Sequence, residues 1–146
     1  MAGRDPDMKI LVPVDGSSET GRVLGWLVAQ ELLPAGSRFV VLHILAPLNP
    51  CVARSLTPGS LEDYYAAEAQ PVWHLVRPIL QRHHVQAACR HDIGDAARRI
   101  AAVARDEHFD LVIMGSHGHG ALANVVLGSV ATQVLATTSA PVLLVR

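Results

Sequence analysis

The chain has 146 residues, of which 50% are hydrophobic and 17% charged, a balance typical of one compact globular domain and not of a disordered chain. Lysine and arginine total 12 and aspartate and glutamate total 13, so the formal net charge is −1. This argues against a nucleic-acid-binding surface, because no excess of positive charge is present to displace counterions. Only 4% of the residues are aromatic, so we expect a core of Ala, Val, Leu and Ile.

The cysteines and the start of the chain indicate a reducing compartment and no membrane association. Cys51 and Cys89 are too few for a disulfide framework and lack the spacing of metal ligands. Residues 1–7 are polar and contain no apolar stretch of the kind found in a secretory signal. No apolar run reaches the length of about 18 residues that a bilayer requires. We therefore expect a cytoplasmic protein with a flexible tail (residues 1–7) and one domain (residues 8–146).

The first predicted strand covers residues 10–14, an apolar run typical of a strand buried on both faces. Pro13 has no N–H group, so regular pairing should be lost there. Residues 15–18 predict a turn, in which Ser17 or Ser18 can cap the next helix. That helix should end near Pro34. Its apolar face is predicted from helical spacing to consist of Val23, Leu24, Leu27, Val28 and Leu32.

The middle of the chain predicts a second and a third strand separated by a loop and a helix. Residues 39–45 form a second buried strand, and residues 46–60, with three prolines, a loop. Residues 61–84 predict a helix that two internal prolines (at 71 and 78) should kink or break. Residues 85–89 form a weak third strand.

The remaining elements complete an alternating pattern. Gly94 opens a helix, residues 111–114 and 142–145 are strands, and a short helix precedes the last strand. One face of the helix after Gly94 is predicted to contain Ile93, Ala97, Ile100, Ala101 and Ala104. The alternation of strands and helices predicts an α/β fold with an open five-stranded parallel sheet and helices on both faces. Ligands bind such sheets beyond the carboxyl ends of the strands, so residues 13–18 and 115–129 should meet at the site.

A glycine-rich segment, residues 115–129, follows the fourth strand and leads into the last helix. Glycine permits positive φ and close backbone approach, so successive N–H groups can form an anion-binding nest. The helix start near Gly128 and Ser129 adds unpaired N–H groups and the positive end of a dipole. These features favour phosphate binding. A plain strand-to-helix connection is the alternative, and the number of glycines alone does not decide between the two.

The spacing of this segment resembles the G-x2-G-x9-G-S nucleotide motif of the universal stress protein family, carried here by Gly115, Gly118, Gly128 and Ser129. Three further landmarks of the family occur in the expected order: residues 10–17 (ILVPVDGS), His43-Ile44 and residues 141–145 (PVLLV). The resemblance extends over nearly the whole chain. It implies the strand order 3-2-1-4-5 of the adenine nucleotide alpha hydrolase-like folds. Neither a Walker P-loop nor a GxGxxG fingerprint is present.

In the ATP-binding branch of this family, the residue matching Asp15 lies near the ribose and the phosphate-bound Mg²⁺, and the residue matching Ile44 meets adenine through its backbone. The resemblance therefore implies ATP, with Mg²⁺, as the ligand, and an indirect metal contact for Asp15. From the residues alone, Asp15 can equally be a turn residue that caps the first helix. The implied nucleotide site consists of Pro13, Val14, Asp15, Ile44, Met114, Gly115, Gly118, His119, Gly128, Ser129 and Val130.

Two positions depart from the family pattern, because His119 and Asn124 stand where lysine or arginine is frequent. Each missing cation removes about 1 kcal/mol of interaction with a triphosphate. Protonated His119 can recover part of this. We expect ATP binding to be weak, pH-dependent or shifted towards a less charged nucleotide. The eight histidines form no recognisable ligand set, so we expect no dedicated transition-metal site.

The sequence therefore predicts an ATP-binding regulatory protein of the stress response, with no catalytic residue assigned. The resemblance implies a homodimer formed through the last strand, which would also protect an exposed apolar edge. A slow ATP hydrolase or phosphotransfer enzyme is an alternative, although no general base or arginine is clearly placed for it. A nucleotide-free dimeric interaction protein is another, disfavoured by the intact glycines and mildly favoured by the missing cations. The sequence does not identify a regulatory protein partner.

Overall fold

A computed structural model describes residues 7–31, 33–118, 124 and 126–146. Five parallel strands form one sheet in the order β3-β2-β1-β4-β5, which confirms the predicted fold class and strand order. The strands are β1 (Lys9–Val14), β2 (Arg38–Leu45), β3 (Ala87–Ile93), β4 (Leu111–Gly115) and β5 (Val142–Val145).

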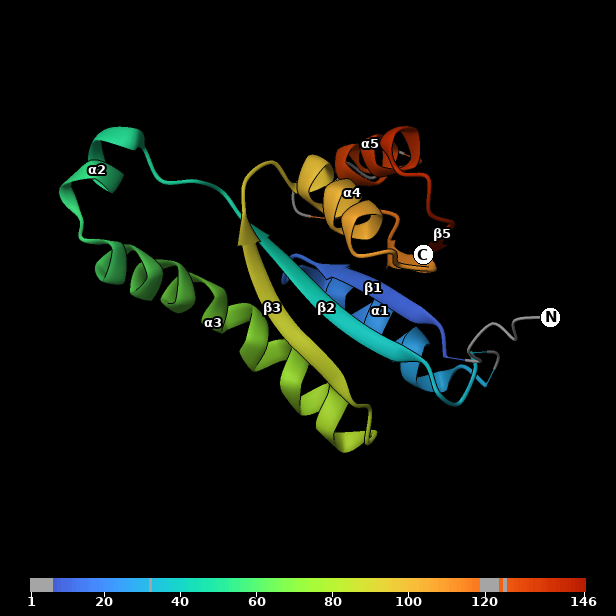
Figure 1. The fold of residues 1–146 in the computed structure, drawn as a ribbon. Coiled ribbons are helices and arrows are strands. Elements are labelled where there is room, and N and C mark those ends of the chain that lie inside the picture. The colour runs from blue at the N-terminus through green and yellow to red at the C-terminus, as the bar shows by residue number, and fades with distance from the viewer. Residues whose placement is uncertain (1–6, 32, 119–123, 125) are drawn as a thin grey trace.

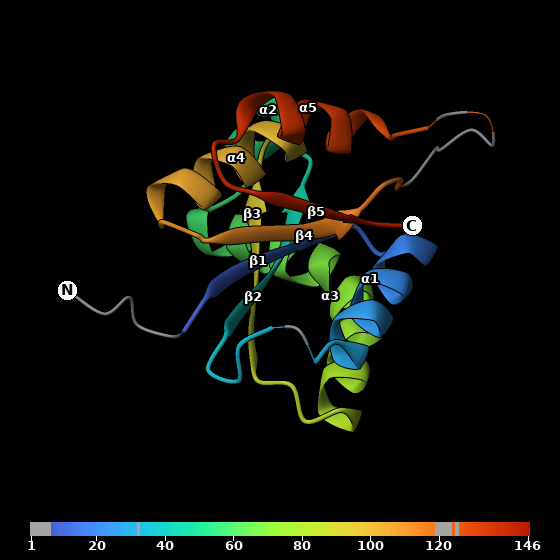
Figure 2. The ribbon, with the colours of Figure 1, turned by 90° about the vertical axis from the view of Figure 1, so that its right-hand side faces the viewer.

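Helices cover both faces of this sheet, as predicted. They are α1 (Ser18–Ala29), α2 (Pro50–Ser55), α3 (Pro58–Arg82), α4 (Ala96–Asp106) and α5 (Ser129–Thr137). Helices α1 and α3 lie on one face and α4 and α5 on the other, whereas α2 lies away from the sheet (Figures 1 and 2). No helix in the described part of the chain is both long and apolar enough to cross a membrane.

The strand β1 contributes to two separate hydrophobic clusters. Ile10, Val12 and Val14 pack with buried residues of α1 and α3, whereas Leu11 packs with those of α4 and α5. Successive side chains of a strand point to opposite faces, so both faces of β1 need apolar residues. This explains why the first strand appears in the sequence as an almost continuous apolar run.

Pro13 has the predicted effect on one side of β1 only. The register with β2 continues from Lys9 to Val14 and includes Pro13 opposite Leu42. The register with β4 ends at Leu11, which lies opposite Val112. Because β1 and β4 stop pairing before their carboxyl ends, the loops that follow these two strands can separate.

The predicted break of the third helix is wrong. Helix α3 runs through both internal prolines, whose side chains lie on its exposed side. An internal proline costs about 3 kcal/mol because it removes a hydrogen bond and crowds the preceding turn. The apolar face that compensates for this cost consists of Tyr65, Ala69, Val72, Trp73, Val76 and Leu80. The predicted loop before this helix is also wrong in part, because residues 50–55 form α2.

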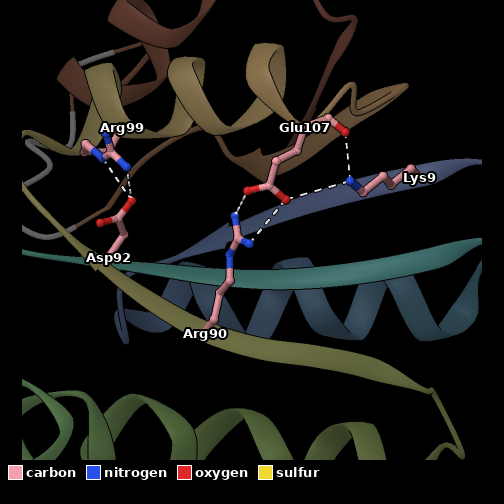
Figure 3. Close-up of polar contacts among 5 residues, drawn as sticks. All are labelled: Lys9, Arg90, Asp92, Arg99 and Glu107. Carbon is pink, nitrogen blue, oxygen red and sulfur yellow. Dashed lines mark hydrogen bonds and ion pairs between the residues drawn. The ribbon is translucent and has the colours of Figure 1, made fainter.

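The third strand differs from its predicted bounds of residues 85–89, since β3 begins at Ala87 and continues to Ile93. Its second half carries charged residues, which is why it does not look like a strand in the sequence. These charges are paired with Arg99 of α4 and with Glu107, the residue that follows α4 (Figure 3). The Arg90 guanidinium donates to the Glu107 carboxylate, with one N···O distance of 3.2 Å, and Arg99 Nε donates to Asp92 Oδ2 at 2.9 Å.

The bounds of α4 and α1 differ slightly from those that the sequence predicted. Helix α4 begins at Ala96 after an Asp95 N-cap, so Ile93 ends β3 and does not belong to the helical face predicted for it. The other residues predicted for that face are buried: Ala97, Ile100, Ala101 and Ala104. Helix α1 ends at Ala29, earlier than expected, and the predicted core residue Leu32 lies outside the described residues.

The ion pair between β3 and α4 should make stability depend on pH. The hydrogen bond from Arg90 lowers the pKa of the Glu107 carboxyl, and partial burial opposes this effect without reversing it. A lowered pKa in the folded state stabilises the fold above the unfolded pKa of about 4.3 and loses this contribution as pH falls. We expect Glu107→Gln to lower the free energy of unfolding by about 0.5–1 kcal/mol at neutral pH, because the pair is partly exposed.

Urea unfolding at neutral pH and at about pH 3.5 tests this expectation. The stability difference between wild type and Glu107→Gln should be present at neutral pH and shrink at the lower pH. Glu62→Gln, on the exposed side of α3, serves as the control for a change in charge alone. A difference of the same size at both pH values would contradict the assignment.

Candidate functional site

A cavity of about 450 Å³ lies at the carboxyl ends of β1, β2 and β4. It is bordered by residues 13–15 of the first segment that the sequence placed at the site, and by residues 115, 117, 118, 128 and 129 of the second. Every predicted site residue that the structure describes lines this cavity: Pro13, Val14, Asp15, Ile44, Met114, Gly115, Gly118, Gly128, Ser129 and Val130. His119, the remaining predicted site residue, lies outside the described residues, and Asn124 is an exposed turn residue.

Sequence reasoning missed the part of the cavity wall that helices and β2 supply, and one residue of the glycine-rich segment, His117. The additional lining residues from helices and β2 are Glu19, Thr20, Val23, Leu42, Ala96, Ile100 and Ala131. Helical spacing was the available signal: positions 96 and 100 are one turn apart on α4, and positions 19 and 23 one turn apart on α1. The family motif consists of loop residues and therefore does not point to them.

One part of the cavity is apolar and can accept a flat hydrophobic group. Leu42 and Ile44 lie near the carboxyl end of β2, Ile100 projects from α4, and Met114 lies near the end of β4. Leu42 and Met114 belong to the cluster that packs beneath α4 and α5, with Ile44 packed against it. This wall is therefore held by the core of the protein and is not formed by a loop alone.

His43 braces this part of the site from the opposite face of the sheet. Its side chain is buried and lies edge-on to the ring of Trp73 on α3. Because the carbonyl of Val14 can only accept, His43 Nδ1 donates to it at 3.0 Å. The bond ties β2 to the last residue of β1, directly before Asp15.

Asp15 stabilises the turn before α1, which is one of the two roles that the sequence allows for it. Its Oδ1 accepts from the backbone N–H of Ser17 at 2.9 Å and from the Thr20 hydroxyl at 3.3 Å. Such a turn, in which the side chain bonds the backbone two residues ahead, is common for aspartate. The turn fixes the carboxylate at the border of the cavity, so the structural role and a contact with a ligand are compatible.

Thr20 holds the other end of this turn. Its side chain is 2% exposed, and its Oγ1 accepts from the N–H groups of Gly16 at 3.0 Å and Asp15 at 3.3 Å. Gly16 has a φ of +79°, a left-handed conformation that glycine adopts without strain. Ser17 occupies the N-cap position of α1 and makes no side-chain capping bond, so the Thr20 hydroxyl stabilises the turn before the helix and does not cap the helix itself.

The glycine segment passes very close to Asp15. A Cβ atom placed on Gly118 would lie 2.5 Å from Asp15 Oδ2, and one on Gly128 would lie 3.2 Å from the Cα of His117. The backbone is also drawn together by the bond from Gly128 N to Ser116 O, at 2.7 Å. Neither Gly118 nor Gly128 has positive φ, so our expectation of that conformation is wrong for these two. Glycine is required here because of close packing.

The start of α5 gives the cavity an anion-binding character. The helix begins at Ser129 with Gly128 as its N-cap, no side chain among the described residues caps it, and Gly128, Ser129 and Val130 all border the cavity. The first N–H groups of a helix have no partner within the helix, and the positive end of its dipole adds to their effect. This end of the cavity can therefore bind phosphate or another anion.

The charged side chains of the cavity wall are acidic. Asp15 and Glu19 are carboxylates, and no lysine or arginine is present among the described lining residues. The undescribed residues 119–123 and 125 contain none either. The described part of the chain also holds no group of three or more His, Cys, Asp or Glu side chains that could bind a metal ion.

His117 and Ser116 form a contact that resembles a base and a nucleophile. Ser116 Oγ and His117 Nδ1 are 2.8 Å apart, and His117 borders the cavity. Ser116, however, is only 1% exposed and is not among the lining residues. A nucleophile must reach the bound substrate, so this pair does not make a catalytic centre in the observed conformation.

The chain matches the universal stress protein family over residues 8–146. The chain belongs to this family. Universal stress protein sequences similar to it include one from Thermus aquaticus, 30% identical with 94% of this chain and 97% of that protein covered. Another is Slr1230 from Synechocystis sp., 28% identical over 94% of this chain. This chain spans only 42% of the length of Slr1230.

Solved structures of universal stress proteins share the fold. MJ0577, a Methanocaldococcus jannaschii protein, has a TM-score of 0.75 and 28% identity, with 94% of each chain covered. A universal stress protein in complex with cAMP has a TM-score of 0.68 and 19% identity, covering 95% of this chain and 97% of its own. An Arabidopsis thaliana protein of the family with AMP bound has a TM-score of 0.65 and 16% identity, covering 94% and 90%.

The hydrogen bonds of Thr20 predict a specific loss of stability. Thr20→Val keeps the shape of the side chain but leaves the half-buried N–H of Gly16 without its acceptor, which should cost about 1 kcal/mol of unfolding free energy. Urea unfolding followed by circular dichroism measures this. Thr137→Val, at the exposed end of α5, is the matched control and should change stability by less than about 0.5 kcal/mol. Equal stability of Thr20→Val and wild type would show that the turn does not need this hydroxyl.

Proposed function

We propose that this universal stress protein binds an adenine nucleotide, specifically ATP with Mg²⁺, and acts as a regulatory protein of the stress response in the cytoplasm. One observation carries the proposal: the predicted site residues that the structure describes line a single cavity at the carboxyl ends of the strands. Open α/β sheets bind their ligands at this position. The AMP and cAMP complexes of proteins with the same fold add support for an adenine nucleotide.

The shape and chemistry of the cavity suggest how the nucleotide would lie. Adenine would rest against the apolar wall and meet the backbone of Ile44, and the ribose would lie near Asp15. The phosphates would reach the N–H groups at the start of α5, beside Gly118. Each of these positions borders the cavity.

Mg²⁺ fits this arrangement as an ion that arrives with the nucleotide. Magnesium is commonly bound by one or two carboxylates together with substrate phosphates and water. Asp15 would contribute indirectly, through the phosphate-bound ion, and the ion would neutralise charge on the phosphates.

A regulatory role is favoured over catalysis. Phosphoryl transfer needs a positioned nucleophile and strong neutralisation of charge. Ser116, whose hydroxyl contacts His117, is buried outside the cavity lining, and the described cavity wall has no arginine or lysine. A slow hydrolase therefore stays the second candidate, and a nucleotide-free interaction protein the third.

The small molecules that copurify with the protein distinguish the three candidates. The protein is purified without added nucleotide and denatured, and the released compounds are identified by mass spectrometry. ATP or another intact adenine nucleotide in near-stoichiometric amount is the expected result. ADP alone would favour the hydrolase, and the absence of any nucleotide would favour the interaction protein.

The close approach of the glycine segment predicts the effect of a larger side chain. Gly118→Val or Gly128→Val should abolish nucleotide binding, because the added atoms would meet Asp15 or the backbone of His117. Calorimetric titration of ATP with Mg²⁺ measures affinity, and circular dichroism verifies the fold. Gly25→Ala is the matched control, since a Cβ there has no atom within 4 Å. Unchanged affinity in both folded valine variants would refute the phosphate-binding assignment.

We also propose a homodimer formed through β5. This strand lies at one edge of the sheet, and an unpaired edge is a place where another chain can add a strand. Val142 and Leu144 pack against the cluster beneath α4 and α5, so lysine at these positions would disturb the core as well as the edge.

Sedimentation equilibrium of the unmodified protein therefore gives the cleaner test of the dimer. The expected mass is twice the chain mass of 15.6 kDa. Amide hydrogens of β5 should also exchange more slowly than those of β3, the opposite edge strand. A mass of one chain at every protein concentration would contradict the dimer.

A further inference from the structure

Glu19 is a buried carboxylate that the nucleotide motif of the family does not include. It lies in the first turn of α1, borders the cavity and is 8% exposed. Its Oε1 accepts from Arg22 Nη1 at 2.8 Å, whereas its Oε2 is buried and has no hydrogen-bond partner in the described structure. A buried polar oxygen without a hydrogen-bond partner is costly to the fold. Such exceptions in a native structure point to a role beyond stability.

This oxygen lies against the beginning of the glycine segment. A Cβ atom placed on Gly115 would be 3.2 Å from Glu19 Oε2 and 3.0 Å from Glu19 Cβ. A Cβ atom placed on Gly118 would in turn lie 2.5 Å from Asp15 Oδ2. Two carboxylates therefore lie behind the glycine segment, one near Gly115 and the other near Gly118. Both glycines border the cavity in which the phosphates would lie.

The positive charge that accompanies Glu19 is much better solvated than the carboxylate. The side chain of Arg22 is 61% exposed and that of Glu19 is 10% exposed. Water and salt screen an exposed charge, whereas a buried charge acts through a lower dielectric. The carboxylate is therefore the less screened member of this ion pair, and Glu19 borders the cavity. The described wall contains no lysine or arginine, whereas the N–H groups at the start of α5 offset negative charge there.

We propose that Glu19 limits the net negative charge of the nucleotide that the cavity accepts. The site takes an adenine nucleotide of low charge, either a monophosphate or a triphosphate whose charge Mg²⁺ has reduced, and disfavours the free triphosphate. The proposal rests on the nucleotide-binding function proposed above and adds a determinant of specificity to it. Glu19 acts by repulsion through the backbone of Gly115 and needs no direct contact with the phosphates.

The test compares dissociation constants of AMP, of ATP with Mg²⁺ and of ATP with EDTA, measured by calorimetry for wild type and Glu19→Gln. In wild type, free ATP should bind more weakly than AMP and more weakly than ATP with Mg²⁺. Glu19→Gln removes the charge at nearly constant volume. The dissociation constant of free ATP divided by that of AMP should therefore fall by about tenfold. Adenosine, which carries no phosphate, should bind both proteins equally.

Two further variants keep the test decisive. Arg22→Gln changes a mostly exposed side chain and leaves Glu19 without its cation, so it should increase the preference for AMP over free ATP. Glu62→Gln, on the exposed side of α3, removes one negative charge away from the cavity and should leave the ratio unchanged.

Each contrary outcome identifies a different failure. If AMP binds but Glu19→Gln leaves the ratio unchanged, the proposal about Glu19 is wrong and nucleotide binding stands. If Glu19→Gln weakens adenosine as well, Glu19 is a hydrogen-bond acceptor for the nucleoside and the charge limit is wrong. If no adenine compound binds wild type, both the charge limit and the proposed function fall.

Discussion

The site depends on the divergence of the chain after β1 and β4. These neighbouring strands lie at the centre of the sheet, yet β1 leads to α1 on one face and β4 leads towards α5 on the other (Figure 2). Their pairing ends at Leu11, before their carboxyl ends, so the two strands diverge there. The cavity lies beyond this point, bordered by residues of both loops, which approach one another again at Asp15 and Gly118. The apolar wall, the Asp15 turn and the start of α5 face one another because of this single change of direction.

The electrostatics of the cavity combine two opposing features. The start of α5 attracts anions through its unpaired N–H groups, whereas Asp15 and Glu19 repel them. Universal stress proteins that carry lysine or arginine in the glycine-rich loop have a further source of attraction that this chain lacks at positions 119 and 124. If the cavity binds a nucleotide as proposed, this balance would make the affinity depend on the charge of that nucleotide.

The sequence predicted the elements that are determined by local pattern. Continuous apolar runs identified the buried strands, and the glycine spacing identified the loop at the cavity. It failed where a distant contact decides the outcome. Helix α3 passes through its prolines because its apolar face is buried against the sheet, and β3 can include Arg90 and Asp92 because Glu107 and Arg99 neutralise them. Glu19 was missed for the same reason, since its position beside Gly115 results from the packing of α1 against β4.

The central claim is that the ends of β1, β2 and β4 and the start of α5 form one nucleotide site. Titration of AMP into ¹⁵N-labelled protein, followed by amide chemical shifts, tests this claim most directly. The account predicts saturable shifts that centre on Asp15, Ile44, Gly118 and Ser129, with no comparable change along the exposed side of α3. Saturable shifts that centre on α3 or on the loop before it, or an unchanged spectrum at saturating AMP, would contradict it.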